Sequence, residues 1–325
     1  MKSNYYPHTG CVNLKKLRGG SMKIAIIGGA GLIGSTAAYE IGRRSMVDEI
    51  CLIDVRQKLA KAHQLDMEQA IPLVSKTRIT SGDWEALTGS DLVIITVGKA
   101  DLDKPVASRM ERLKDNLTIL TDVCHNLKQY THNPIIINVT NPLDVLNTVL
   151  QQLTGIHRQR ILGLSLNDTY RFRWALAHVL AEEINAIEAY VLGEHGEEQC
   201  PICSQIYVNG KKINLTIEQK EKVLSTVHGW FKAYQSLHSG RTAAWLSAIS
   251  IADIVEAICH DTGEVLPCSV IDEEGISLGR LVRVGREGIK QFVPLEMNQE
   301  EEAQFERARQ KVMQTLKNIG YLRVP

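Results

Sequence analysis

The sequence has no excess of either charge, because 37 lysine and arginine residues balance 37 aspartate and glutamate residues among its 325 positions. Composition therefore gives no reason to expect a nucleic acid or an anionic membrane as a partner. The chain also lacks an apolar run near the roughly 20 residues that span a bilayer, and it lacks the apolar start of a secretory signal. These absences predict a soluble cytoplasmic protein.

The cysteines give no metal-binding pattern. There are seven, an odd number scattered along the chain, which suits reduced thiols in a cytoplasm. Cys200-Pro-Ile-Cys203 has the spacing of a redox pair or of half a zinc site. Since no second pair occurs at metal-ligand spacing, we interpret these cysteines as structural thiols and expect no metal.

Residues 23–54 read as an apolar run, a glycine-rich turn, a helical segment and a second apolar run. Gly29-x-Gly31-x-x-Gly34 has the spacing of a dinucleotide-binding loop. Gly29 would allow a tight strand-to-helix turn, Gly31 would let the backbone approach a pyrophosphate, and Gly34 would let the helix pack closely on the strand. The pyrophosphate would then lie on the helix N-terminus.

Asp54 ends the second apolar run. A carboxylate at this place accepts hydrogen bonds from both hydroxyls of a ribose and would repel a 2′-phosphate. The combination of strand, turn, helix, second strand and acid therefore predicts NAD, rather than NADP, as the cofactor.

The first half of the chain alternates between apolar runs of strand length and helical periodicity. That alternation predicts an α/β fold, in which a Rossmann-type doubly wound parallel sheet has its ligand crevice at the carboxyl ends of the strands. We expect strands at 24–27, in the run before Asp54, and at 76–80, 91–97, 134–139 and 160–163, with helices at 57–70 and 108–129. Ser108-x-x-Glu111 would cap the second of these helices.

The pattern changes after the sixth strand and predicts a mixed α+β catalytic domain. Helices are expected at 167–183, 217–237 and 242–259, a strand at 186–192, hairpin turns at Asn209-Gly210 and 285–288, and a final helix capped by Asn298-x-x-Glu301. We therefore expect three parts, an N-terminal arm (1–21), an NAD-binding Rossmann domain (22–164) and a substrate domain (165–325).

Four stretches carry polar groups that apolar packing does not explain. They are Ser108-Arg109, Asn138-Val139-Thr140-Asn141-Pro142, Asn167-Asp168-Thr169-Tyr170-Arg171 and Gly193-Glu194-His195-Gly196. Asp168 and Arg171 share one helical face because they are three positions apart. His195 lies between glycines just after a strand, so its ring is free to face a cleft.

With these motifs in this order behind the dinucleotide loop, the chain resembles the lactate/malate dehydrogenase family from Met22 to its C-terminus. The lactate dehydrogenase-like branch is the closer one. The resemblance implies an NAD-dependent L-2-hydroxy acid dehydrogenase that transfers hydride reversibly between NADH and a small 2-oxo acid. It also implies a homodimer or homotetramer.

The resemblance assigns roles to five residues. His195 would donate and accept the proton, oriented and made more basic by Asp168, and Arg171 would clamp the substrate carboxylate. Arg109 would polarise the carbonyl when the loop before it closes, and Asn141 would hydrogen-bond the reacting oxygen. The cofactor contacts would be Gly29, Gly31, Leu32, Ile33, Gly34, Asp54, Val97, Gly98, Asn116 and Val139.

Substrate choice in this family rests largely on the loop at 98–107, which is slightly longer here than in the common lactate form. Aligning Lys104-Pro105 places Asp103 at the specificity position, although Leu102 or Asp101 also fits there. A carboxylate there would oppose a second substrate carboxylate by up to about 4 kcal/mol at about 4 Å and an effective dielectric of about 20. This favours a 2-hydroxy acid with a neutral, hydroxylated or cationic side chain, lactate included.

Other interpretations stay open. Arg241, next to Thr242 at the expected far wall of the pocket, would restore malate as substrate if its side chain turned inward. NAD-dependent glycosidases share a similar fold, but they use a cysteine–histidine metal site that the context of His195 does not suggest. A non-catalytic NAD-binding sensor would keep the glycine loop but could lose the polar site residues, which are retained here.

Overall fold

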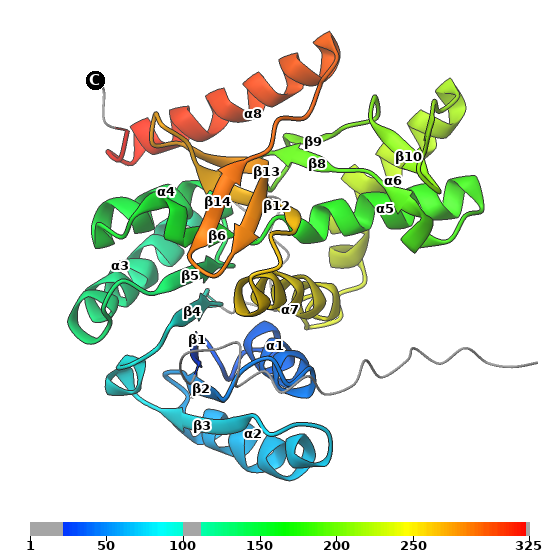
Figure 1. Cartoon of the computed structure of the whole chain (residues 1–325). Coiled ribbons are helices and arrows are strands. Elements are labelled where there is room, and N and C mark those ends of the chain that lie inside the picture. Colours follow the sequence, from blue (N-terminus) through cyan, green and yellow to red (C-terminus); the bar gives the residue numbers. More distant parts are fainter. Residues whose placement is uncertain (1–21, 100–111, 323–325) are drawn as a thin grey trace, which may run out of the picture.

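The computed structural model describes residues 22–99 and 112–322, so the expected N-terminal arm (1–21) and most of the 98–107 loop lie outside the described residues. Strands and helices alternate through the first half, as expected (Figure 1). This half contains β1 (Lys23–Ile27), α1 (Leu32–Arg43), β2 (Glu49–Ile53), α2 (Gln57–Ala70), β3 (Arg78–Gly82), β4 (Leu92–Ile95), α3 (Leu113–Tyr130), β5 (Ile135–Asn138), α4 (Leu143–Thr154) and β6 (Ile161–Gly163).

These six strands are parallel neighbours in the order β3-β2-β1-β4-β5-β6. The chain runs outward from β1 in one direction to β2 and β3, and in the other to β4, β5 and β6. The predicted doubly wound sheet is therefore confirmed. Its order reverses beside β1, and a crevice at the carboxyl ends of β1 and β4 is where such sheets bind ligands.

Both faces of this sheet are covered by helices, which is why its strands read as continuous apolar runs. Ile24 and Ile26 of β1 pack with α1, α2 and α7, whereas Ala25 and Ile27 pack with α3 and α4. Successive side chains of a strand point to opposite faces, so each strand contributes to both cores. The core thus holds the carboxyl ends of the strands in a fixed arrangement.

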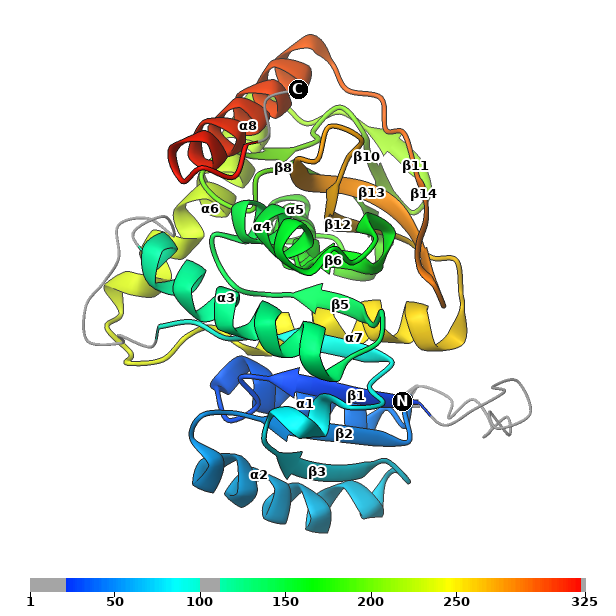
Figure 2. The same cartoon turned by 90° about the vertical axis from the view of Figure 1, so that its left-hand side faces the viewer.

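The second half is the predicted mixture of helices and antiparallel strands (Figure 2). It contains α5 (Leu166–Leu180), β7 (Ile187–Glu188), β8 (Val191–Gly193), β9 (Gln199–Pro201), β10 (Ile206–Val208), β11 (Lys211–Ile213), α6 (Ile217–Ser236), α7 (Trp245–His260), β12 (Val265–Ile271), β13 (Ser277–Gly285), β14 (Gly288–Phe292) and α8 (Gln299–Asn318). β12 pairs with β6 through Ser269 and Gly163, so one large sheet continues from the first half into the second.

Two hairpin turns and one helix cap expected from the sequence are confirmed. Asn209 and Gly210 both have positive φ and join β10 to β11, and Asn298 forms a capping box with Glu301 at the start of α8. The second hairpin turn, between β13 and β14, pairs Gly285 with Gly288.

Some elements differ from the sequence-based expectation. The single strand expected at 186–192 is wrong, because β7 pairs with β10 in a small sheet and β8 pairs with β13 in the large one. The chain changes sheets between these two short strands, and periodicity along the sequence carries no sign of that. α7 begins at Trp245 rather than 242. α3 is described from Leu113, so the helix start expected at 108 and its cap by Ser108 and Glu111 lie outside the described residues.

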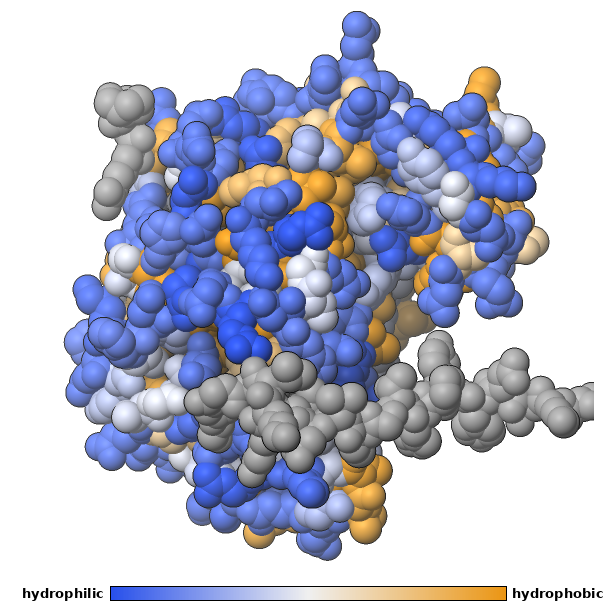
Figure 3. Space-filling model, in the orientation of Figure 1, coloured by the Kyte–Doolittle hydropathy of each residue, from blue (hydrophilic) through white to orange (hydrophobic). Residues whose placement is uncertain are grey.

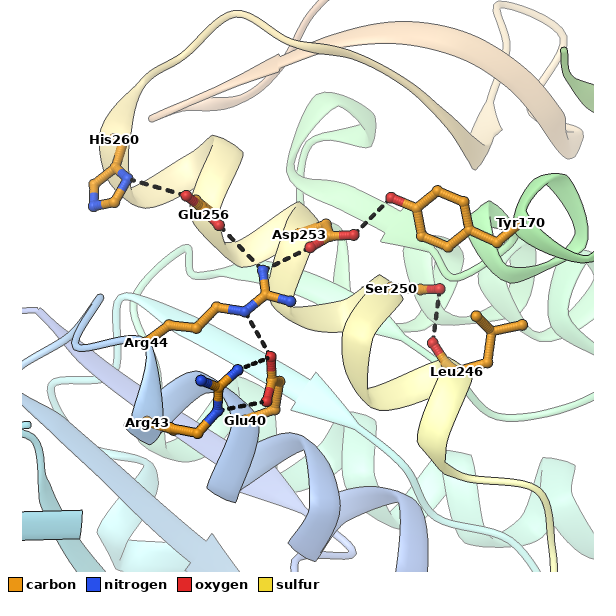
Figure 4. Close-up of polar contacts among 9 residues, drawn as sticks. All are labelled: Glu40, Arg43, Arg44, Tyr170, Leu246, Ser250, Asp253, Glu256 and His260. Atoms are coloured by element: carbon orange, nitrogen blue, oxygen red, sulfur yellow. Dashed lines mark hydrogen bonds and ion pairs between the residues drawn. The ribbon is translucent and has the colours of Figure 1, made fainter. Parts of the chain in front are cut away.

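A cluster of ion pairs connects the two halves beside α7, which lies between α1 and the β12–β13 hairpin (Figure 1). The guanidinium of Arg44, at the end of α1, donates to Glu40 at 2.8 Å, Asp253 at 2.6 Å and Glu256 at 3.1 Å (Figure 4). The hydroxyl of Tyr170 on α5 donates to the other oxygen of Asp253 at 2.6 Å. The helix behind the glycine turn is therefore tied through α7 to the helix that carries Asp168 and Arg171.

Hydrophilic side chains cover most of the face shown in Figure 3, and hydrophobic ones appear there in small groups. No helix among the described residues combines the length and the apolar composition needed to cross a membrane.

Candidate active site

The glycine turn joins β1 to α1 and presents bare backbone to the crevice. Gly28, rather than Gly29, adopts the positive φ of 87° that the tight turn needs, which the sequence analysis did not foresee. A Cβ on Gly34 would lie 2.4 Å from the carbonyl oxygen of Gly28, and one on Gly31 would lie 3.1 Å from the same oxygen. Gly31 is the N-cap of α1 and has no side chain to cover the first helical amides. This cradle fits the pyrophosphate of a dinucleotide.

Asp54 follows β2 and lies against this turn. Its side chain is only 5% exposed, and its two oxygens accept hydrogen bonds from the backbone amides of Ala30 at 3.0 Å and Arg56 at 2.9 Å. The guanidinium Nε of Arg56 lies 3.3 Å from the same carboxylate. A negative charge is thus fixed beside the glycine cradle, where it can accept hydrogen bonds from ribose hydroxyls.

The other expected cofactor contacts lie at the start of α1 or just after the carboxyl ends of strands. Leu32 and Ile33 open α1, Val97 follows β4 and Val139 follows β5, and all four are half-buried. They form apolar rims on both sides of the sheet, because Ile33 and Val139 pack on one core and Val97 packs on the other.

Asn116 braces the crevice from α3. Its Oδ1 accepts a hydrogen bond from the amide of Lys99 at 2.9 Å, and its Nδ2 donates to the carbonyl of Asn141 at 2.7 Å. The hydroxyl of Thr140 also donates to the carbonyl of Val97 at 2.8 Å. These bonds hold together the segments that leave β4 and β5. Gly98 is exposed beside them.

His195, Asp168 and Arg171 converge on one point although they lie on different elements. Asp168 and Arg171 occupy the first turns of α5, and His195 follows β8 behind Gly193, whose φ is 80°. One carboxylate oxygen of Asp168 contacts Nδ1 of His195, and the other accepts from Nη1 of Arg171 at 3.0 Å. The side chains of His195 and Asp168 are both 5% exposed, and that of Arg171 is 12% exposed. Burial strengthens these charge interactions relative to a surface pair.

Asp144 supports the histidine and was not foreseen from the sequence. One of its oxygens accepts from the backbone amide of His195 at 2.7 Å, and the other accepts from the hydroxyl of Ser269 at 2.5 Å. Burial raises the pKa of this carboxyl to about 7, although these hydrogen bonds act in the opposite direction. The available signal was an acid among apolar residues, three positions after Asn141.

Glu194 anchors the same loop to the C-terminal helix. Its carboxylate accepts from Nζ of Lys311 on α8 at 3.0 Å and from the amide of Glu198 at 2.9 Å. A Cβ on Gly196 would lie 2.8 Å from this carboxylate, so a larger residue there would displace the carboxylate from this position. Both neighbours of His195 in the sequence therefore have packing roles.

A cavity of about 300 Å³ opens at His195, Asp168 and Arg171. Its lining also includes Trp230 on α6, and the guanidinium carbon of Arg171 lies 4.1 Å from the centre of that ring. Trp230 was not foreseen either, because nothing in the sequence distinguishes it from a core residue.

The remaining predicted site residues have different outcomes. The buried Oδ1 of Asn141 makes no hydrogen bond within the described structure. Arg109 and Asp103 lie outside the described residues. Arg241 and Thr242 are exposed ahead of α7, and neither is among the described residues that line the cavity. Their assigned roles stay predictions.

Cys200 and Cys203 are free thiols. Burial raises the pKa of Cys200 to about 12 and that of Cys203 to about 11. Such thiols are protonated at neutral pH and react poorly, which agrees with a structural role. Across residues 22–99 and 112–322, no group of three or more potential metal ligands is clustered.

Comparison with known proteins identifies both halves of the chain. Residues 22–163 match the family model of the lactate/malate dehydrogenase NAD binding domain, and residues 166–320 match that of the lactate/malate dehydrogenase alpha/beta C-terminal domain. A malate dehydrogenase of Chlorobium luteolum is 32% identical over 312 residues, which cover 93% of this chain and 99% of that protein. One from Haloarcula marismortui is 31% identical over 288 residues, which cover 86% of this chain and 93% of that protein.

Solved structures agree with this result. The malate dehydrogenase of Cryptosporidium parvum is 29% identical, with a TM-score of 0.86 over 92% of this chain and all of that one. The lactate dehydrogenase of the same organism, solved with lactic acid and NAD, is 27% identical, with a TM-score of 0.87 over 94% of this chain and 99% of that one. The chain therefore belongs to the lactate/malate dehydrogenase family and is an NAD-dependent 2-hydroxy acid dehydrogenase.

Proposed function

We propose that this enzyme interconverts a small L-2-hydroxy acid and its 2-oxo acid, and that malate and oxaloacetate are the first pair to test. The observation that carries the proposal is the double contact of Asp168 with His195 and Arg171. Through it, one carboxylate sets the position of a proton-transfer group relative to a carboxylate-binding group. Both groups face the same cavity.

The proposed reaction divides among these side chains. The guanidinium of Arg171 pairs with the substrate carboxylate in a bidentate arrangement. In the reducing direction, His195 donates the proton on Nε2 to the carbonyl oxygen, while Asp168 at Nδ1 holds the ring in the required orientation. Asn141 donates a hydrogen bond to the same oxygen. Bound NADH supplies the hydride that completes the new C–H bond.

The relatives are named as malate dehydrogenases, which favours malate over the lactate or other substrate without a second carboxylate that the sequence first suggested. Both curated relatives described above are malate dehydrogenases. A second substrate carboxylate needs a cation, and Lys232 on α6 lines the cavity that Arg171 lines. Lys311 also lines it but is paired with Glu194 and Glu197. We therefore propose Lys232 as the partner of the second carboxylate, with Arg241 as the alternative.

A monocarboxylate such as lactate is the second candidate. The observation in its favour is the alignment of Asp103 with the specificity position, because a carboxylate there opposes a dianionic substrate. The exposed position of Arg241 outside the cavity lining agrees with this candidate.

Steady-state oxidation of NADH with oxaloacetate, pyruvate and longer 2-oxo acids tests the proposal. We expect the highest kcat/KM with oxaloacetate, and a loss with Lys232→Gln that Arg241→Gln does not cause. A preference for pyruvate would instead support the second candidate, a monocarboxylate such as lactate. If the enzyme turned over none of these 2-oxo acids, the proposed function would be contradicted. Oligomerisation and cytoplasmic location stay predictions.

A further inference from the structure

Arg171 packs on an aromatic ring as well as against Asp168. Its guanidinium carbon lies 4.1 Å from the centre of the Trp230 ring, and Nη1 donates to Asp168 at 3.0 Å. Arg171 and Trp230 lie on different helices, α5 and α6, that pack side by side. The arginine is therefore held from two directions by two separate elements.

The two contacts use different parts of the guanidinium. A cation–π contact uses its flat face, whereas hydrogen bonds to carboxylates use the N–H groups at its edge. Stacking on Trp230 therefore leaves edge donors for both Asp168 and a substrate carboxylate. A planar group fixed on one face can rotate less, so less entropy is lost when the substrate pairs with it.

Trp230 is itself fixed by its helix. Val223, Val227 and Trp230 follow at spacings of four and three, so they lie on one face of α6. Val223 and Val227 are buried in the core shared with Phe172 and Leu176 of α5. The packing of α6 on α5 thus sets the distance between the Trp230 ring and Arg171.

A second aromatic ring extends this arrangement. Tyr234, one turn after Trp230, stacks on it with ring centres 5.3 Å apart and planes 20° apart. Offset stacking of this kind restricts the rotation of the indole. The indole is therefore a rigid platform for the guanidinium.

We propose that Trp230 is a positioning residue for Arg171. By holding the face of the guanidinium, the indole keeps the guanidinium edge directed to the substrate carboxylate. The inference rests on the proposed function and extends it. Trp230 acts on substrate binding, since hydride transfer and NADH binding depend on other residues. Because the ring also forms a cavity wall, it limits the width available beside the substrate carboxylate.

Variants at Trp230 test the role of the ring. In Trp230→Leu, which removes the aromatic face but keeps an apolar side chain, KM for the 2-oxo acid should rise about tenfold. kcat and KM for NADH should stay within about twofold. Trp230→Phe, which retains an aromatic face, should recover most of the loss. Trp174→Leu on α5 is the matched control, because Trp174 is 51% exposed and stacks on His178 instead.

A double-mutant cycle with Arg171→Lys tests whether Trp230 acts through the arginine. Lysine keeps the charge but not the planar face, so adding Trp230→Leu to this variant should change KM by less than about twofold. An equal rise of KM in both backgrounds, or a parallel loss of NADH affinity, would overturn the inference. So would an unchanged KM in Trp230→Leu when the unmodified enzyme is active. An inactive unmodified enzyme would overturn the proposed function and this inference together.

Discussion

The glycine cradle and the proposed proton-transfer site are encoded in different ways. The cradle is continuous, since the glycine turn, its helix and Asp54 follow one another within residues 28–54. The proton-transfer site joins Asp144, Asp168 and His195, and the pairs in contact are 51 and 27 positions apart. The cradle depends on backbone shape, whereas the proton-transfer site depends on charges that tertiary packing brings together. Different substitutions should therefore damage each one.

Replacement of the histidine should have the largest effect and should affect only the proton-transfer site. His195→Gln removes the group that we propose exchanges the proton, so kcat should fall about a thousandfold. NADH affinity, measured by fluorescence titration, should change by less than about twofold. His178→Gln on the exposed face of α5 is the control. If the His195 variant also lost NADH binding, the two regions would not be separable.

Gly34→Ala should have the complementary effect. The added Cβ would lie 2.4 Å from the backbone oxygen of Gly28, which cannot move without distorting the turn. We expect a loss of about 1–3 kcal/mol in the free energy of unfolding, together with weaker NADH binding. Gly229→Ala is the matched control, because nothing lies within 4 Å of the Cβ it would add. If Gly34→Ala bound NADH with the affinity of the wild type, the glycine turn would not be the binding site of the dinucleotide.

Asp54→Asn should change which dinucleotide is used without changing the chemistry. Removing the buried charge removes its repulsion of a 2′-phosphate, and the guanidinium of Arg56 remains beside the site. The ratio of kcat/KM for NADPH to that for NADH should rise about tenfold. Adding Arg56→Gln should reverse much of that gain. A ratio that stays at the wild-type value would mean that Asp54 does not select the cofactor.

Asp144→Asn should give the smallest effect, visible as a change in pH dependence. Burial raises the pKa of this carboxyl from 3.8 to about 7, so the folded state favours its protonated form. Its contribution to stability is complete below about pH 4 and is lost as pH rises through about 7. Relative to wild type, the variant should therefore gain stability as pH rises from about 4 to about 7, with no further gain above that, in denaturant titrations. If the difference in the free energy of unfolding between the variant and the wild type did not change with pH, Asp144 would not be the group that titrates in this range.

The same contrast explains how much of the molecule could be predicted from sequence. The six parallel strands, α2 at 57–70 and the turn at Asn209-Gly210 depend on local periodicity and on glycine or asparagine conformations, and the structure confirms them. The family motifs also pointed to Asp168, Arg171 and His195, which the structure brings together.

The misses that concern the site and the sheet topology involve contacts between distant segments. The division of 186–192 between two sheets depends on β10 and β13, neither of which is marked within the segment itself. Asp144 gains its role only when β8 brings the amide of His195 to it, and Trp230 gains its role only when α6 packs on α5. Such residues look like ordinary polar or core positions in the sequence.

The pairing of β12 with β6 joins the two halves of the molecule within one β-sheet. Because hydrogen bonds, and not side-chain packing alone, cross this junction, thermal unfolding should proceed as a single cooperative transition. Dinucleotide binding to the cradle would then slow hydrogen exchange in β12 and β13, which β4, β5 and β6 separate from β1 in the sheet.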